Sequence, residues 1–200
     1  MIRVLLVDDH PALRAGLTAV LRAEPGIEPV GTASSPEEVW PQFNRTRPDL
    51  VVLDYHLPGM DGLVLCRQLK CEVPTPGVLV YSAYADASLT IPAILAGADG
   101  LIHKGVPAQE LTQAIRGIAR GDRVLPPLRQ ELQMAAAEKL DVDDQPILGM
   151  RLAGTGHHDI AQTLRLTGAE LNRRLDAMIE RLRVDVPTAA TADAGARMRW

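Results

Sequence analysis

The residues that could do chemistry together are three aspartates, a serine and a lysine. Asp8, Asp9, Asp54, Ser82 and Lys104 each follow a short apolar run directly or one residue later. Runs of that length and composition are typical of buried parallel strands. Because ligands gather beyond the carboxyl ends of parallel strands, we expect these five side chains to meet at one edge of a sheet.

Such a cluster would suit a divalent cation and a phosphoryl group. Carboxylates held together raise one another's pKa values unless a cation neutralises them, and hard oxygen ligands with open water positions suit Mg²⁺. A lysine ammonium and a serine hydroxyl could stabilise a transferred phosphoryl group, which a carboxylate can itself accept. An Asp-Asp pair alone is more often a turn or a helix cap, so the prediction rests on all five residues together.

The surrounding sequence supplies the elements that would position these groups. Residues 1–121 alternate apolar runs with amphipathic stretches of helical period, which predicts a doubly wound α/β fold around a parallel sheet. Pro11, Pro36 and Pro107 stand where helices should begin, because proline suits the first helical turn. The five expected strands are Val4–Val7, Val30–Ala33, Leu50–Leu53, Val78–Tyr81 and Gly100–His103.

Four segments carry a family resemblance. The chain resembles the receiver domain of bacterial two-component response regulators in VLLVDDH, LDYHLPGMDG, VYSAY and AGADGLIHKG. The resemblance covers the α/β part of the chain and implies a flavodoxin-like five-stranded sheet with strand order 2-1-3-4-5. It also implies a sensor histidine kinase as partner, and no enzymatic activity beyond the receiver's own phosphoryl transfer and hydrolysis, since no separate catalytic pocket or glycine-rich nucleotide loop is apparent.

The resemblance also gives each residue of the cluster a role. Asp54 would accept the phosphoryl group. Asp8 and Asp9 would hold Mg²⁺ together with Asp54 and the backbone carbonyl of His56. By the same resemblance, Ser82 would contact the phosphoryl oxygens when the switch closes, and Lys104 would pair with the phosphate.

Two features near the cluster bear on how a receiver would switch. Three residues before Lys104 the family usually carries a mobile aromatic ring, but this chain has Leu101. We therefore expect either apolar repacking in its place or a weaker coupling between phosphate and output. His56 and Tyr84 are expected to shield the phosphate from water, and the alternative is that both are ordinary surface side chains.

The remainder of the chain divides into three parts. Residues 122–140 predict a linker with one short helix. Residues 141–186 contain no strand pattern, only short helices, which predicts a small all-α output domain. Residues 187–200 lack periodicity and are expected to be disordered.

The all-α part contains a candidate DNA-binding motif. Residues 159–171 have the apolar spacing and turn of a helix-turn-helix, and behind a receiver they resemble the LuxR-type output domain of the NarL/FixJ class. The resemblance implies DNA binding by a homodimer formed on activation. Thr167 would cap the recognition helix, and Asn172, Arg173 and Arg174 would face the DNA.

The match in this half is degraded. Pro146 and Gly149 fall within the first helix, which should therefore be short, and Glu170 and Asp176 place negative charge where DNA phosphates would lie. Residues 149–184 contain six arginines and four acidic residues, and the resulting net charge of +2 is small for a DNA-binding domain. The alternative stays open that these helices bind a protein partner or dimerise, or that the chain drains phosphate from a kinase.

Composition and the apolar pattern argue against a membrane protein and a secreted protein. The 200 residues are 46% apolar with a net charge of −4, and no apolar stretch approaches the ~18 residues of a membrane span. The acids at positions 8 and 9 interrupt the apolar run that a secretory signal needs, so a cytoplasmic protein is expected. Cys66 and Cys71 cannot form a disulfide framework and fit no metal spacing, so both are expected to be reduced thiols. His157 and His158 have no third ligand nearby, so we expect them to be loop residues rather than metal ligands.

Overall fold

A five-stranded parallel sheet lies at the centre of the computed structural model, which describes residues 1–183. Its strands are β1 (Ile2–Val7), β2 (Ile27–Ala33), β3 (Leu50–Asp54), β6 (Gly77–Ser82) and β7 (Gly100–His103). Their order across the sheet is β2-β1-β3-β6-β7, and every neighbouring pair is parallel. This confirms the five expected strands and the flavodoxin-like order.

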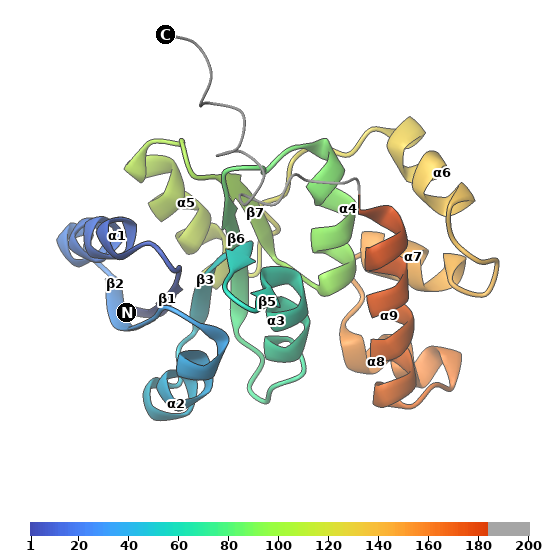
Figure 1. Ribbon diagram of the computed structural model, residues 1–200, viewed down its shortest axis with the longest axis horizontal. Helices are drawn as coiled ribbons and strands as arrows, with labels where there is room; N and C mark the ends of the chain where they lie inside the picture. Colours follow the sequence, from blue (N-terminus) through green and yellow to red (C-terminus); the bar gives the residue numbers. More distant parts are fainter. Residues whose placement is uncertain (184–200) are drawn as a thin grey trace, which may run out of the picture.

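Helices cover both faces of this sheet (Figure 1). They are α1 (Pro11–Ala23), α2 (Pro36–Thr46), α3 (Gly62–Leu69), α4 (Ala87–Ala96) and α5 (Ala108–Ala119). The apolar sides of α1 and α5 share one buried cluster with the sheet, and those of α2, α3 and α4 share another. The sheet is therefore buried on both faces, as its nearly continuous apolar strands require.

Local sequence sets the helix ends closest to the predicted cluster. Pro11 and Pro36 occupy the first positions of α1 and α2, as expected. The start of α3 lies so close to the end of β3 that a Cβ on Gly62 would collide with the carbonyl oxygen of Asp54. Glycine at position 62 thus allows the chain to turn back directly behind Asp54.

A small hairpin that the sequence did not predict lies between Asp54 and α3. It consists of β4 (His56–Leu57) and β5 (Met60–Asp61), which pair antiparallel so that His56 is opposite Asp61. The turn between them contains Gly59 with a positive φ of 77°. The hairpin fixes the backbone that follows the candidate phosphoacceptor.

The C-terminal part is all-helical, as predicted. Its helices are α6 (Gln130–Glu138), α7 (Gln145–Leu152), α8 (His157–Leu164) and α9 (Gly168–Leu182). The short α7 confirms the effect expected of Pro146 and Gly149. The interpretation of His157 and His158 as loop residues is wrong: Gly156 is the N-cap, so both form the first turn of α8.

Helix α9 packs along α4 of the receiver region, where the two ribbons lie side by side (Figure 1). One apolar cluster runs from the sheet through α4 into the C-terminal helices. The buried residues that α9 contributes to it are Leu171, Leu175, Met178, Ile179 and Leu182. The expected disorder of 187–200 concerns residues outside the described range.

None of the helices described in the structure is long and apolar enough to cross a membrane.

Candidate functional site

Three strand ends bring a lysine and two aspartates into direct contact. Asp54 is the last residue of β3, and Asp8 and Lys104 follow β1 and β7. The Lys104 Nζ donates hydrogen bonds of 2.7 Å to Oδ2 of Asp8 and of 2.7 Å to Oδ2 of Asp54. Both aspartates are only 3% exposed. The structure therefore brings together residues that are 96 and 50 positions apart.

Backbone N–H groups hold the other oxygen of each buried carboxylate. The His10 N–H donates to Asp8 Oδ1 at 2.7 Å, and the His56 N–H donates to Asp54 Oδ1 at 3.2 Å. Each carboxylate is thus fixed from two sides, which leaves its orientation defined before any ligand arrives.

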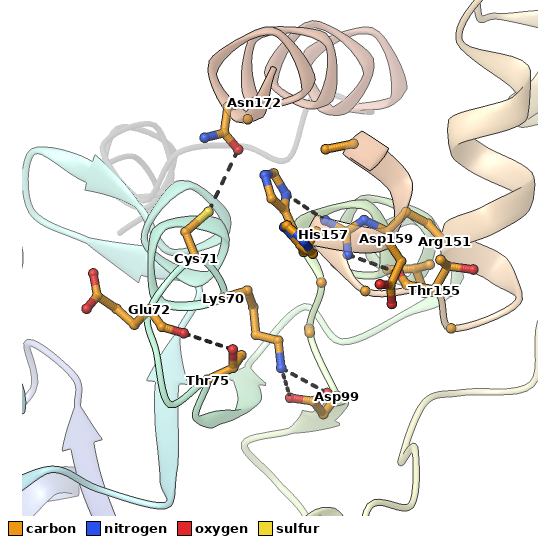
Figure 2. A pocket seen from close by; sticks show the side chains of 18 of the residues that line it. Lys70, Cys71, Glu72, Thr75, Asp99, Arg151, Thr155, His157, Asp159 and Asn172 are labelled. Carbon is orange, nitrogen blue, oxygen red and sulfur yellow. Dashed lines mark hydrogen bonds and ion pairs between the residues drawn. The ribbon is translucent and has the colours of Figure 1, made fainter. Parts of the chain in front are cut away.

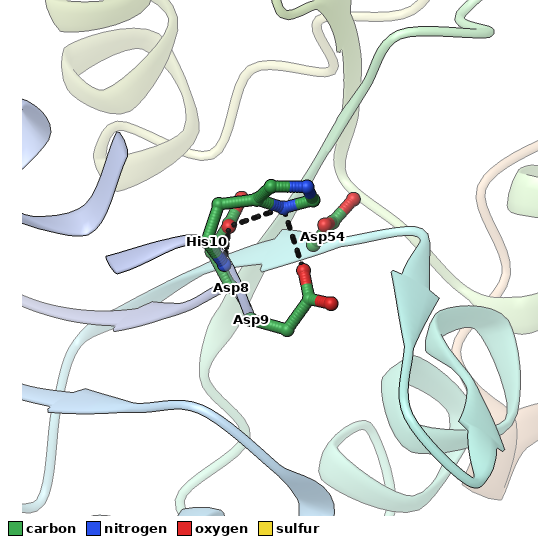
Figure 3. A group of neighbouring side chains, drawn as sticks. All are labelled: Asp8, Asp9, His10 and Asp54. Carbon is green, nitrogen blue, oxygen red and sulfur yellow. Dashed lines mark hydrogen bonds and ion pairs between the residues drawn. The ribbon is translucent and has the colours of Figure 1, made fainter. Parts of the chain in front are cut away.

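Asp9 and the ring of His10 complete the cluster (Figure 3). One ligand atom from each of Asp8, Asp9, His10 and Asp54 lies within 4.8 Å of the others. The His10 Nδ1 lies 2.6 Å from Asp9 Oδ1 and 3.3 Å from Asp8 Oδ1. Sequence reasoning missed His10 as a member of the site, although its position directly after Asp9 was the available signal.

Burial and charge act in opposite directions on the central pair. Burial raises the pKa of Asp54 and the Asp8 carboxylate adds to the rise, whereas hydrogen bonding and charge from Lys104 oppose it. Burial alone would lower the pKa of Lys104, but its hydrogen bonds to Asp54 and Asp8 outweigh burial and raise that pKa. Lys104 therefore stays charged and balances part of the negative charge.

The donor set fits a hard divalent cation. The three aspartates supply carboxylate oxygens, and Asp9, on the solvent side, leaves room for water ligands. The single positive charge of Lys104 is shared by Asp8 and Asp54, and Asp9 adds a third carboxylate. The pocket therefore has an excess of negative charge that one divalent cation would neutralise. Oxygen donors of this kind favour Mg²⁺ over softer metals.

Ser82, Leu101 and the two aromatic rings lie around this cluster without joining it. Ser82 is fully buried, and its Oγ accepts a hydrogen bond of 3.0 Å from the Tyr84 N–H. Its carbonyl accepts one from the Lys104 N–H. Leu101 is buried in the apolar cluster on the α4 side of the sheet. The rings of His56 and Tyr84 meet edge to face, with centroids 5.3 Å apart.

Comparison with known proteins agrees with this geometry. Residues 4–116 match the response regulator receiver domain family. The chain belongs to the response regulators. Over the receiver, the match covers every strand end that contributes to the cluster.

Relatives that match along most of the chain place the regulator in the NarL/LuxR class. The "DNA-binding transcriptional activator DevR/DosR" of Mycobacterium tuberculosis is 31% identical over 204 residues, covering 97% of this chain and 94% of that protein. A crystal structure of a LuxR-family two-component response regulator from Aurantimonas sp. is 31% identical with a TM-score of 0.59, covering 68% of this chain and 96% of that one. The response regulator ChrA of a heme-sensing two-component system is 32% identical with a TM-score of 0.54, and 96% of each chain is covered.

The candidate DNA-contacting residues of the regulator lie on or beside α9. Thr167 is the N-cap of α9, as predicted, and its Oγ1 accepts a hydrogen bond of 3.1 Å from the Glu170 N–H. Arg173 pairs with Glu170 at 2.7 Å, and Arg174 with Asp144 at 3.5 Å. Both arginines are therefore partly neutralised by acids of their own region.

The opposite side of α9 contacts the receiver through polar groups as well as through its apolar residues. Arg67 of α3, 7% exposed, donates to both carboxylate oxygens of Asp176 at 2.8 and 3.0 Å. Arg183 pairs with Asp61, the N-cap residue of α3. Asn172 faces Cys71, at 4.0 Å from its Sγ. In this arrangement the receiver covers one side of the candidate recognition helix.

Proposed function

We propose that the chain is a cytoplasmic transcription regulator in which a sensor histidine kinase phosphorylates Asp54 and thereby controls DNA binding by the C-terminal helices. The observation that carries this proposal is the buried Asp54, held at 2.7 Å from Lys104 beside two further aspartates at the edge of the sheet. Residues 1–121 would form the receiver, 122–140 the linker and 141–186 the output domain.

The phosphoryl transfer follows from the contacts of Asp54. An oxygen of its carboxylate attacks the phosphorus of the kinase's phosphohistidine, a P–O bond forms, and the P–N bond breaks as the imidazole leaves. Lys104 stabilises the charge on the phosphoryl oxygens. Mg²⁺, when held by Asp8, Asp9, Asp54 and the His56 carbonyl, supplies further charge neutralisation.

The switch would use Ser82 and the contact between α4 and α9. The Ser82 hydroxyl, now bonded to the Tyr84 N–H, would turn to the phosphoryl oxygens, and the loop before α4 would move with it. Any shift of α4 disturbs its packing against α9. A released α9 could then bind a paired DNA site as a homodimer, in keeping with the DNA-binding relative.

The first test is phosphorylation of the intact chain by a small-molecule phosphodonor with and without Mg²⁺. Mass spectrometry should find one added phosphoryl group on wild-type protein with Mg²⁺, and none on Asp54→Asn. The matched control is Asp122→Asn, an exposed aspartate of the linker, which should be labelled like the wild type. Equal labelling of Asp54→Asn at the same peptide would overturn the assignment of Asp54.

A second candidate function has one observation in its favour. Glu170 and Asp144 neutralise the arginines of α9, so these helices could instead bind a protein or dimerise, or the chain could serve as a phosphate sink. The discriminating measurement is binding to genomic DNA fragments at several salt concentrations, with and without the phosphodonor. Binding that weakens steeply with salt supports DNA recognition, and undetectable binding in both states supports the second function.

A further inference from the structure

A pocket of about 1010 Å³ lies between the receiver and the C-terminal helices (Figure 2). The receiver contributes Lys70 and Cys71 after α3 and Asp99 before β7. The C-terminal helices contribute Arg151 and His157, together with further residues that line the pocket. This volume is in the range of pockets that hold small organic ligands, and it lies well away from Asp54, since none of the acidic cluster lines it.

The unusual feature of this pocket is Arg151. The residue is 5% exposed, yet among residues 1–183 no carboxylate lies within ion-pair distance of it, and its Nε is buried without a hydrogen-bond partner. Its terminal nitrogens reach only the Thr155 carbonyl and the His157 Nδ1, both at a long 3.4 Å. A buried guanidinium without a counter-charge is strongly unfavourable.

Arg67 shows what a compensated arginine looks like in the same protein. It is buried to a similar extent, at 7% exposure, but forms a bidentate pair with Asp176 at 2.8 and 3.0 Å. Arg151 has the burial of Arg67 without its carboxylate. The geometry therefore leaves a place for an anion on the Arg151 side of the pocket.

The acids in the pocket wall do not fill that place. Asp99 accepts hydrogen bonds from Lys70 and from the Val78 N–H. Glu72 and Asp159 also line the pocket, but neither forms an ion pair with Arg151 in the described part of the chain. Arg123, which lies on the same wall, donates to the carbonyls of Arg151 and Leu152 rather than to a carboxylate.

His157 adds a polar group that suits an anion. Burial and the neighbouring Arg151 lower the pKa of His157 to about 4, so the ring is neutral near pH 7. Its Nδ1 faces Arg151, which leaves Nε2 as the N–H that can donate to a ligand. Gly168, at the N-terminus of α9, also lines the pocket.

We propose that this pocket binds a small organic oxyanion, with a carboxylate or phosphate group on Arg151, and that the bound ligand holds α9 against the receiver. We call the arrangement in which α9 is docked on the receiver the closed arrangement. Residues of both the receiver and the C-terminal helices line the pocket, so a ligand that binds only the closed arrangement stabilises it by mass action. The site itself is independent of phosphorylation, and only its effect on DNA binding rests on the proposed function.

The experiment measures thermal unfolding of the full chain in EDTA, with inorganic phosphate or acetate added at constant ionic strength. One of the two anions should raise the unfolding midpoint of wild-type protein by about 5–10 °C at a concentration a hundredfold above its Kd. Comparing the two anions identifies which head group the pocket prefers. Without either anion, Arg151→Met should be at least as stable as the wild type, because no ion pair is lost.

Three variants assign the effect to one site. Arg151→Met should lose the anion-dependent shift, whereas Lys104→Gln, in the Asp54 pocket, and Arg173→Gln, an exposed arginine of α9, should keep it. The proposal is overturned if wild type and Arg151→Met respond alike, including no response by either, or if Lys104→Gln loses the shift. These midpoints do not require DNA binding, so they decide the site even if the proposed function fails. For the effect on α9, the anion should slow hydrogen exchange in α9 of wild type but not of Arg151→Met.

Discussion

The acidic pocket at the sheet edge and the contact face of α9 both concentrate charged side chains, but their partners come from different places. In the pocket, Asp8, Asp54 and Lys104 satisfy one another at 2.7 Å within the receiver. On α9, Asp176 is paired with Arg67 only because the receiver lies against the helix. The first arrangement is built into one sheet, whereas the second depends on how two parts of the chain are docked.

This difference indicates which part should change during signalling. The strands hold the acidic pocket whether or not α9 is docked, so the pocket can be ready for phosphoryl transfer in either state. The polar contacts of α9 form in the closed arrangement and can be exchanged for contacts with a partner. Variants that weaken docking should therefore leave the acidic pocket itself intact and change output.

The largest expected effect comes from the apolar residues that α9 contributes to the core. Leu175 is fully buried on α9, and Leu175→Ala should lower the free energy of unfolding by about 2–5 kcal/mol, measured by urea denaturation. The matched control is Leu132→Ala on α6, where the leucine is 36% exposed and the loss should be below about 1 kcal/mol. Equal losses would show that α9 is not part of the buried core.

The next effect concerns the polar half of the same face. Arg67→Ala removes the bidentate pair with Asp176, and because Asp176 is itself half-exposed, no buried charge is stranded. A loss of roughly 1.4 kcal/mol from the closed arrangement would shift its population about tenfold. Unphosphorylated Arg67→Ala should therefore show faster hydrogen exchange in α9 and about tenfold tighter DNA binding.

Arg120→Ala is the matched control for that variant, because Arg120 pairs with Asp122 on the open surface. It should behave like the wild type in both measurements. An Arg67→Ala protein with unchanged exchange in α9 would mean that the ion pair does not hold the helix.

A smaller effect tests the surroundings of the acidic pocket. The adjacent rings of His56 and Tyr84 should hinder water from reaching a phosphoryl group on Asp54. The double variant His56→Asn, Tyr84→Ala should then lose phosphate about two- to fivefold faster, followed by mass spectrometry after removal of the phosphodonor. Slower loss than in the wild type would contradict the shielding role.

The last effect is a pH dependence. The pKa of His157 is lowered from 6.5 to about 4, so below pH 6.5 the unfolded chain takes up a proton that the folded chain resists. This contribution to stability is therefore lost progressively as the pH falls from about 6.5 towards 4. His157→Gln should flatten that part of the stability profile, and the exposed His158→Gln should not. Parallel profiles for all three proteins would contradict the neutral state of His157.

Much of the receiver could be predicted because its chemistry follows from strand order. A polar residue after an apolar run must lie at the carboxyl edge of a parallel sheet, so Asp8, Asp54 and Lys104 could be brought together from the sequence. Sequence spacing gives no side-chain direction, however. It therefore could not show that the His10 ring points towards Asp8 and Asp9 or that the Ser82 hydroxyl is bonded to its own loop.

The C-terminal half was less predictable for a different reason. Helical periodicity shows that Leu171, Leu175 and Ile179 form a buried face, but it does not identify the surface that covers it. For the same reason the sequence shows Arg151 only as one of six arginines in a weakly basic region. In the structure Arg151 is buried and has no carboxylate partner in the described part of the chain. Such contacts depend on the relative placement of distant segments.

Asp61 connects the two regions that this comparison separates. It is paired with His56 in the hairpin behind Asp54, it caps α3, and its carboxylate binds Arg183 at the end of α9. In the proposed function, esterification of Asp54 favours release of α9, so the two events are thermodynamically linked, and linkage is reciprocal. A regulator whose α9 is engaged on an operator should consequently reach a higher phosphorylated fraction at equilibrium than a free one, so that the promoter itself helps to set the level of the signal.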